Sequence, residues 1–185
     1  MSVTPTRLRP AVFLDRDGVI NRVTLCRGNP RPPASLGDLE ILPGVAEALS
    51  TLKAHGFALI VVTNQPDVAR GTASEASVAS IHAQLAESLE IDAILTCFHD
   101  DGDACDCRKP KPGLLLQAAE TFGIDLRSSF MVGDRWRDIE AGRQAGCRTF
   151  WINGGYLERQ AVAYDFRVRT LSEAAAVILA QAPPR

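Results

Sequence analysis

Two carboxylates follow the first apolar segment of the sequence, at the place where a strand gives way to a turn. Asp15 and Asp17 come directly after residues 11–14, Ala-Val-Phe-Leu, a short apolar run typical of a buried parallel strand. Side chains two residues apart in an extended segment point the same way, so both carboxylates can face one site. Gly18 then provides the backbone freedom to turn. Solvated turns that do no chemistry contain the same residue types, and this alternative stays open on these residues alone.

Two further apolar segments end in polar side chains. Residues 57–62 run into Thr63 and Asn64, and residues 130–132 run into Gly133 and Asp134. Ligands of open α/β sheets bind outside the carboxyl ends of the strands. We therefore expect the polar groups that follow these strands to converge with Asp15 and Asp17 at one edge of a sheet.

Converging carboxylates point to phosphoryl transfer assisted by a metal ion. They repel one another, and a hard cation such as Mg²⁺ neutralises them while leaving positions for water and phosphate. One carboxylate could attack phosphorus to give an aspartyl-phosphate, while a second acid protonates the leaving oxygen and later activates water. The Thr63 hydroxyl, the Asn64 amide and a lysine would donate to the phosphoryl oxygens.

A loop rich in cysteine supplies that lysine, and its composition is typical of a zinc site. Four candidate ligands lie close together in it: Cys97, His99, Cys105 and Cys107. Tetrahedral zinc takes four such ligands and keeps no position for water, which predicts a structural role. Disulfides are the alternative, which the lack of an export signal disfavours. Closing the loop on zinc would fix the backbone of Arg108 and Lys109 at the active site, and the isolated Cys26 and Cys147 are predicted to be ordinary thiols.

The elements that must position these groups alternate between strand and helix. Strands are predicted at residues 11–14, 57–62, 91–96, 130–132, 148–152 and 166–168. Helices are predicted at residues 43–55, 74–89, 112–122, 136–145 and 172–180. Alternation of this kind indicates an α/β fold with a three-layer, Rossmann-like parallel sheet covered by helices on both faces. We expect residues 1–185 to form a single domain, and we give His82 no role beyond packing or surface exposure.

Residues 22–39 interrupt this alternation, because they are rich in glycine and proline and lack clear periodicity. A loop of this length in a compact domain is usually functional, and this one follows the acidic turn directly. We expect a flap that faces the substrate. A disordered excursion is the alternative that the proline content leaves open.

Composition excludes several other classes of protein. The 185 residues are 46% hydrophobic with a formal net charge of -2, enough for a domain with its own core and without the basic stripe of a nucleic-acid binder. Residues 1–10 are short, polar and broken by proline, so neither a signal peptide nor a membrane span is expected there or later. We expect a cytoplasmic monomer that contacts neither nucleic acid nor membrane.

Taken together, the motifs resemble those of a known superfamily. Residues 15–21 (DRDGVIN), 62–65 (VTNQ), 105–113 (CDCRKPKPG) and 132–134 (VGD) look like the four motifs of the haloacid dehalogenase superfamily. More narrowly, they resemble its capless, zinc-containing branch, which includes D,D-heptose 1,7-bisphosphate phosphatases and histidinol-phosphatases. The resemblance runs in order from about residue 11 to residue 152, and the four motifs with the zinc loop are highly specific together.

The resemblance implies a role for each motif residue. Asp15 would be the nucleophile and Asp17 the general acid/base. Asp15 and Asp134 would bind Mg²⁺ through their side chains, and Asp17 through its main-chain carbonyl. Thr63 and Lys109 would stabilise the transferring phosphoryl group. Substrate would be bound by the side chains of Asn64, Gln65, Arg108 and Arg135. Asp138 would orient the waters of the metal or Lys109, and a solvated helix acid is its alternative.

The choice of substrate rests on smaller differences. Gly113 and the run Ala69-Arg70-Gly71 resemble the heptose enzymes, so removal of the C7 phosphate of D-glycero-D-manno-heptose 1,7-bisphosphate is favoured. Pro66-Asp67 and the segment from Val23 to Ser35 depart from the heptose pattern, which leaves histidinol phosphate or another small sugar or polyol phosphate as alternatives. A non-catalytic binding protein on the same fold is the alternative of another class. Against it, no catalytic position is missing.

Overall fold

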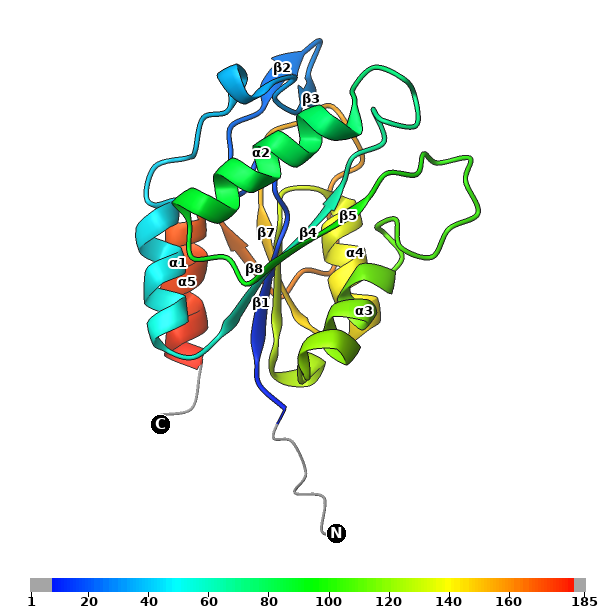
Figure 1. Cartoon of the computed structure of the whole chain (residues 1–185). Coiled ribbons are helices and arrows are strands. Elements are labelled where there is room, and N and C mark those ends of the chain that lie inside the picture. The colour runs from blue at the N-terminus through cyan, green and yellow to red at the C-terminus, as the bar shows by residue number, and fades with distance from the viewer. Residues whose placement is uncertain (1–7, 182–185) are drawn as a thin grey trace, which may run out of the picture.

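A six-stranded parallel sheet lies at the centre of the computed structural model, which describes residues 8–181 (Figure 1). Its strand order is β5-β4-β1-β6-β7-β8. The strands are β1 (Ala11–Leu14), β4 (Ala58–Asn64), β5 (Ala93–Cys97), β6 (Phe130–Gly133), β7 (Arg148–Ile152) and β8 (Phe166–Val168). Every pair in this sheet is parallel, as the sequence predicts.

Helices cover both faces of the sheet. One face packs against α1 (Val45–Ala54), α2 (Glu75–Ser88) and α5 (Leu171–Gln181). The other packs against α3 (Gly113–Phe122) and α4 (Trp136–Ala145), which lie together on the opposite side in Figure 1. The predicted three-layer α/β fold is therefore confirmed.

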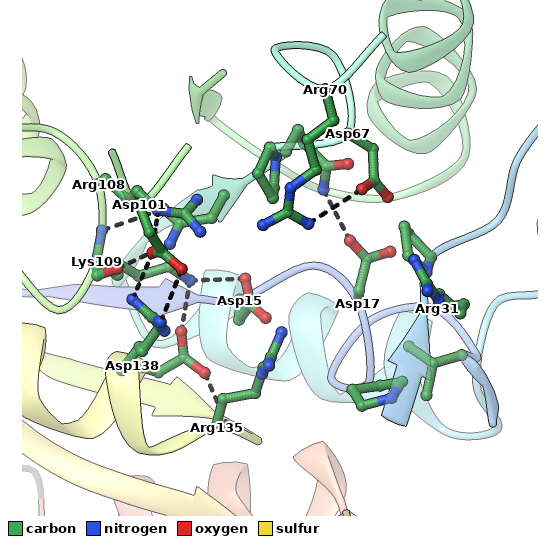
Figure 2. A pocket seen from close by; sticks show the side chains of 17 residues that line it. Asp15, Asp17, Arg31, Asp67, Arg70, Asp101, Arg108, Lys109, Arg135 and Asp138 are labelled. Carbon is green, nitrogen blue, oxygen red and sulfur yellow. Dashed lines mark hydrogen bonds and ion pairs between the residues drawn. The ribbon is translucent and has the colours of Figure 1, made fainter. Parts of the chain in front are cut away.

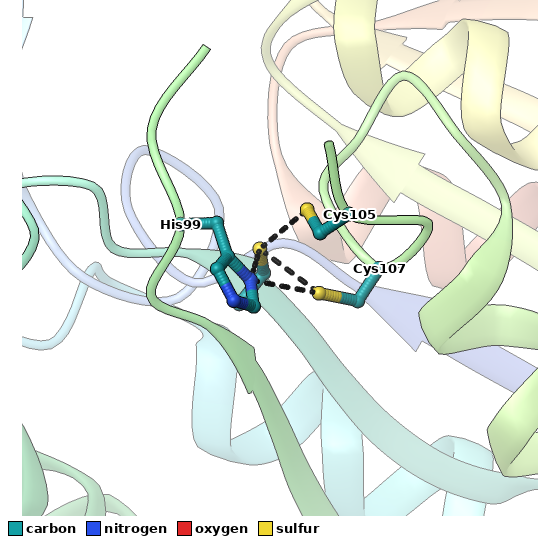
Figure 3. A group of neighbouring side chains, drawn as sticks. His99, Cys105 and Cys107 are labelled. Carbon is teal, nitrogen blue, oxygen red and sulfur yellow. Dashed lines mark hydrogen bonds between the residues drawn. The ribbon is translucent and has the colours of Figure 1, made fainter. Parts of the chain in front are cut away.

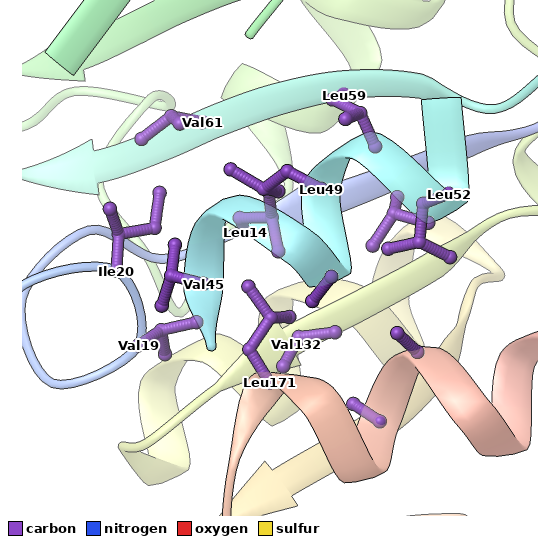
Figure 4. Packing of buried hydrophobic residues seen from close by; sticks show 14 of the residues in the cluster. Leu14, Val19, Ile20, Val45, Leu49, Leu52, Leu59, Val61, Val132 and Leu171 are labelled. Carbon is purple, nitrogen blue, oxygen red and sulfur yellow. The ribbon is translucent and has the colours of Figure 1, made fainter. Parts of the chain in front are cut away.

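The strands are apolar without alternation because both of their faces are buried. In β1, Val12 and Leu14 belong to the core under α1 and α5, whereas Phe13 belongs to the core under α3 and α4. Figure 4 shows the first of these cores, with Leu49 of α1 and Leu171 of α5 packed over the sheet. Each fully buried Leu or Phe side chain contributes ~2–3 kcal/mol to stability, so these contacts hold the strand ends in place.

Predicted element boundaries shift by a few residues where local conformation intervenes. The helix predicted from residue 43 begins at Val45, because Gly44 takes a left-handed conformation with φ of 76° as its N-cap. The strand predicted at 91–96 is Ala93–Cys97. Cys97 therefore ends β5 directly beside Asn64 of β4.

The segment 22–39 is more regular than predicted. It contains an antiparallel hairpin, β2 (Thr24–Cys26) and β3 (Asn29–Arg31), and a 3-10 turn at Leu36–Asp38. Both turn residues of the hairpin, Arg27 and Gly28, have positive φ, which suits the twist of a two-residue hairpin turn. Gly28 O accepts a hydrogen bond of 2.8 Å from Leu157 N. The reading as a loop without regular structure was wrong, and the alternative of a disordered excursion is excluded.

None of the helices within residues 8–181 combines the length and the apolar character that crossing a bilayer requires. The expectation for the start of the chain falls mostly on residues 1–7, which lie outside the described residues.

Replacing Gly142 with alanine should lower the free energy of unfolding, because it would overpack the contact between α4 and the sheet. A Cβ there would lie 2.6 Å from Met131 Cβ and 2.9 Å from Thr149 Cγ2, both on strands. Overpacking of this kind costs about 1–3 kcal/mol, more than the gain in helix propensity. Urea unfolding should show this loss for Gly142→Ala, and no comparable loss for Gly102→Ala, where nothing lies within 4 Å. Equal stability of the two variants would contradict the close packing of α4.

Candidate active site

The polar groups that follow the strands do converge at the carboxyl edge of the sheet. Strand β1 pairs with β4 on one side and β6 on the other, which brings Asp15, Thr63 and Asp134 to neighbouring strand ends. A cavity of about 170 Å³ opens there, lined by Asp15, Asp17 and Lys109 among others (Figure 2). This is the place expected for ligand binding in such a sheet.

Lys109 is the buried cation of the site. Its ammonium lies 2.7 Å from Asp15 Oδ1 and 2.5 Å from Asp138 Oδ1, and it donates to Val62 O at 2.7 Å. Burial alone would lower the pKa of Lys109, but the charges of Asp138 and Asp15 outweigh it and raise that pKa. Lys109 is therefore a fixed positive charge beside Asp15. Asp138 is 2% exposed, so its alternative reading as a solvated helix acid was wrong.

Both of these carboxylates belong to a cluster of three that also contains Asp134. One oxygen from each of Asp15, Asp134 and Asp138 lies within 4.8 Å of the others. Burial raises the pKa of Asp15 to about 6, opposed by Lys109 and reinforced by Asp138 and Asp17. Burial, with the charges of Asp15 and Asp138, also raises the pKa of Asp134. Buried carboxylates this close together can all be ionised only if a further cation binds between them.

Asp134 has one oxygen that no protein group satisfies. Its Oδ1 is buried and has no hydrogen-bond partner, whereas Oδ2 accepts from the Tyr156 hydroxyl at 2.5 Å. Oxygen ligands from one or two carboxylates are what Mg²⁺ takes from a protein. The residues present therefore fit such an ion.

Asp17 is held firmly on the opposite side of the pocket. Its carboxylate accepts hydrogen bonds from Arg16, from Asn21 Nδ2 at 2.9 Å and from Gln65 Nε2 at 2.8 Å. Arg16 has no exposed surface. Its Nη1 lies 3.0 Å from His82 Nε2, and because a guanidinium can only donate, the imidazole must accept and is neutral at Nε2. Burial and the charge of Arg16 lower the pKa of His82 to about 4.

The residues of the second motif contact protein groups rather than the open cavity alone. Asn64 forms two hydrogen bonds with the backbone of Lys109. Its Nδ2 donates to the carbonyl oxygen at 2.9 Å, and its Oδ1 accepts from the amide nitrogen at 3.1 Å. Gln65 Nε2 donates to Thr63 Oγ1 at 2.9 Å as well as to Asp17. Asn64 thus fixes the lysine, and Gln65 links the threonine to Asp17.

The four residues proposed for zinc meet at the base of their loop (Figure 3). Cys97 Sγ lies 3.2 Å from Cys107 Sγ, 3.9 Å from Cys105 Sγ and 3.6 Å from His99 Nδ1. All five cysteines are free thiols, so the disulfide alternative is not realised. The loop also places Arg108 at the pocket, where its guanidinium donates to His99 O at 3.0 Å and to Asp101 at 2.9 Å.

Several groups at the site could not be identified from the motifs. Arg135 does line the pocket, but its guanidinium is bound by Glu158, 23 residues later in the chain. Tyr156 contacts Asp134, 22 residues earlier in the chain, and His82 contacts Arg16, 66 residues earlier. No periodicity or motif signals such contacts, because they depend on where loops and a helix are placed by the fold.

The comparisons with known proteins agree with this geometry. The sequence matches the haloacid dehalogenase-like hydrolase family over residues 33–146. A D-glycero-beta-D-manno-heptose-1,7-bisphosphate 7-phosphatase of Rhodopseudomonas palustris is 38% identical over 158 residues, covering 79% of this chain and 84% of the relative. The protein of that name from Escherichia coli K12 is 40% identical over 152 residues, covering 76% of each chain.

Solved structures give the same result. The D,D-heptose 1,7-bisphosphate phosphatase from B. bronchiseptica, complexed with magnesium and phosphate, superposes with a TM-score of 0.77 at 30% identity and covers 94% of this chain and 99% of its own. An HAD-like phosphatase from Mesorhizobium loti superposes with a TM-score of 0.78 at 28% identity, covering 100% and 92%. The resemblance drawn from the motifs is confirmed, and this chain belongs to the haloacid dehalogenase-like hydrolases.

Proposed function

We propose that this protein is a Mg²⁺-dependent phosphomonoesterase that acts through an aspartyl-phosphate. We further propose that it removes the C7 phosphate of D-glycero-D-manno-heptose 1,7-bisphosphate. The observation that supports the reaction most directly is the buried contact of Lys109 with Asp15, beside the unpartnered oxygen of Asp134. At the carboxyl edge of the sheet, a carboxylate that can act as the nucleophile thus lies beside a cation that can bind phosphate and a carboxylate oxygen that can bind a metal ion.

The metal would be held by Asp15, by Asp134 through Oδ1 and by the main-chain carbonyl of Asp17. When bound, Mg²⁺ supplies charge neutralisation for the phosphoryl oxygens. Lys109 already compensates part of the negative charge of the site, because its ammonium contacts both Asp15 and Asp138.

In the proposed reaction, an oxygen of Asp15 attacks phosphorus and the bond from phosphorus to the sugar oxygen breaks. Asp17 gives its proton to the leaving oxygen. Asp17 then takes a proton from water, which attacks phosphorus and releases phosphate and free Asp15. Lys109 and the Thr63 hydroxyl stabilise the phosphoryl oxygens throughout, and Asn64 keeps the lysine backbone in register.

The charge of the pocket supports a substrate with a second anionic group. Five arginines line the cavity: Arg31, Arg70, Arg108, Arg135 and Arg137. Four of them form ion pairs with carboxylates of the protein. Arg31, on β3, forms none within residues 8–181 and is available to a ligand. A sugar bisphosphate matches this lining, whereas the amine cation of histidinol phosphate meets like charge. The names of the relatives support the heptose assignment.

We also propose that zinc closes the loop at Cys97, His99, Cys105 and Cys107 in a structural site. The cluster holds four ligands and leaves no place for water. Its value to catalysis is to fix the backbone of Arg108 and Lys109. Because every group in the mechanism comes from one chain, we propose that a single domain works as a cytoplasmic monomer.

Substrate specificity tests the proposed function. We expect kcat/KM in the presence of Mg²⁺ to favour one anomer of heptose 1,7-bisphosphate over histidinol phosphate and common sugar monophosphates by about a hundredfold or more, which is ~2.7 kcal/mol of transition-state binding. Asp15→Asn should remain folded and lose about a thousandfold or more. Flat, low activity would reject the heptose assignment, and wild-type protein inactive on every ester would favour the binding-protein alternative.

Elemental analysis tests the zinc site. Protein purified without chelator should hold about one equivalent of zinc, since the ligand set is complete in one chain. Cys105→Ser should lose the zinc and lower the thermal unfolding temperature by several degrees or more, because metal binding contributes to folding. Cys26→Ser is the matched control, since Cys26 is exposed and outside the cluster. Wild-type protein without zinc would refute the site.

Acid should destabilise the fold through His82. Its pKa is about 4 in the fold against an ordinary value of 6.5, so the unfolded chain binds more protons between these values and stability falls as the pH drops through them. His82→Gln keeps an acceptor for Arg16 that cannot be protonated. Between about pH 7.5 and about pH 5, the wild type should lose ~1 kcal/mol more than this variant, a figure discounted for partial exposure. Parallel losses in urea unfolding would show that His82 does not titrate this way.

A further inference from the structure

The loop between β7 and β8 brings a buried tyrosine to the proposed metal site. Tyr156 is 7% exposed, and its hydroxyl donates to Oδ2 of Asp134 at 2.5 Å. The two residues are 22 positions apart, and none of the four motifs contains the tyrosine. The hydrogen bond occupies one carboxylate oxygen and leaves the other, Oδ1, buried without a hydrogen-bond partner.

The backbone of the first motif closes over this hydrogen bond. A Cβ at Gly18 would lie 1.8 Å from Asp134 Oδ2 and 2.7 Å from the Tyr156 hydroxyl oxygen. Glycine at this position therefore allows the close approach as well as the φ of 90°. The backbone of Asp134 is fixed too, because Trp151 Nε1 donates to its carbonyl oxygen at 3.3 Å. Little room remains for the carboxylate to rotate while the hydrogen bond is in place.

The tyrosine loop is itself fastened at several points. Leu157 N donates to Gly28 O of the β2–β3 hairpin at 2.8 Å, and Glu158 forms an ion pair with Arg135 at the start of α4. Gln160 Nε2 donates to Tyr156 O at 3.1 Å. The tyrosine is thus held from the hairpin, from α4 and from within its own loop.

We propose that Tyr156 is a positioning residue for Mg²⁺, which orients Asp134 so that Oδ1 faces the ion. The inference rests on the metal site of the proposed function. The Asp134 carboxylate can rotate about its Cβ–Cγ bond. A hydrogen bond to Oδ2 restricts this rotation and so fixes the direction in which Oδ1 points. Hydrogen-bond partners of metal ligands typically change affinity by about 10–100-fold when they are removed.

Direct metal titration tests this role without substrate. Tyr156→Phe removes the hydroxyl and keeps the ring that packs there. Calorimetric titration of the metal-free protein with MgCl₂ should give a dissociation constant about 10–100-fold weaker than that of the wild type. Tyr164→Phe is the matched control: Tyr164 packs on Trp151 in the same region, with ring centroids 5.0 Å apart, and its hydroxyl makes no hydrogen bond within the described residues. This control should keep the affinity of the wild type.

Two further readouts separate positioning from packing. Metal-free Tyr156→Phe should remain folded and lose in urea unfolding at most the stability that one buried hydrogen bond contributes. In turnover assays, the KM for Mg²⁺ should rise while kcat at saturating Mg²⁺ is largely kept. Unchanged Mg²⁺ affinity, or an equal weakening in Tyr164→Phe, would overturn the role of Tyr156 and leave the proposed function standing. Wild-type protein that binds no Mg²⁺ would overturn both.

Discussion

The enclosure of Lys109 between Asp15 and Asp138 is the interaction on which the site depends. An ammonium that is almost fully buried is tolerated only beside compensating charge, and both carboxylates lie within 2.7 Å of it. Removing either carboxylate would leave the buried ammonium with one compensating charge instead of two, which is costly in a site that excludes water. The three strand ends, the N-terminus of α4 and the loop with the cysteines must therefore stay together. The catalytic arrangement and the stability of the fold share the same contacts.

This arrangement also leaves negative charge uncompensated, which supports the proposed binding of a cation. Three buried carboxylates lie close together and one lysine contacts two of them, Asp15 and Asp138. Burial with mutual repulsion raises the pKa of both Asp15 and Asp134. A divalent ion held as proposed would offset that imbalance and would favour the ionised form of Asp15, which the proposed role as nucleophile requires. Asp17 lies outside this cluster, where its carboxylate accepts hydrogen bonds from Arg16, Asn21 and Gln65.

The sequence predicts the parts of this site that lie on regular elements. Apolar runs locate the strands, and the polar residues after them, such as Asp15 and Asp134, must then meet at one edge. Contacts made by loops escape this reasoning. The hairpin at 24–31 carries Pro30 within a strand and Arg27 at positive φ, and neither residue type signals such a turn. Tyr156 and His82 are placed by tertiary packing, so periodicity assigns them no chemistry.

These same loops take the place of a separate cap domain and decide what the pocket admits. The hairpin contributes Pro30 and Arg31 to the cavity, and Val23, just before it, lines the cavity too. The tip of the hairpin is hydrogen-bonded to the loop that carries Tyr156, so a change in one loop affects both the cavity lining and the tyrosine that contacts Asp134. Most arginines of the pocket are held in advance by carboxylates, so a bound anion orders few side chains and loses little conformational entropy. Among the arginines that line the pocket, Arg31 is the one that forms no ion pair within residues 8–181, so its guanidinium is left for a bound anion.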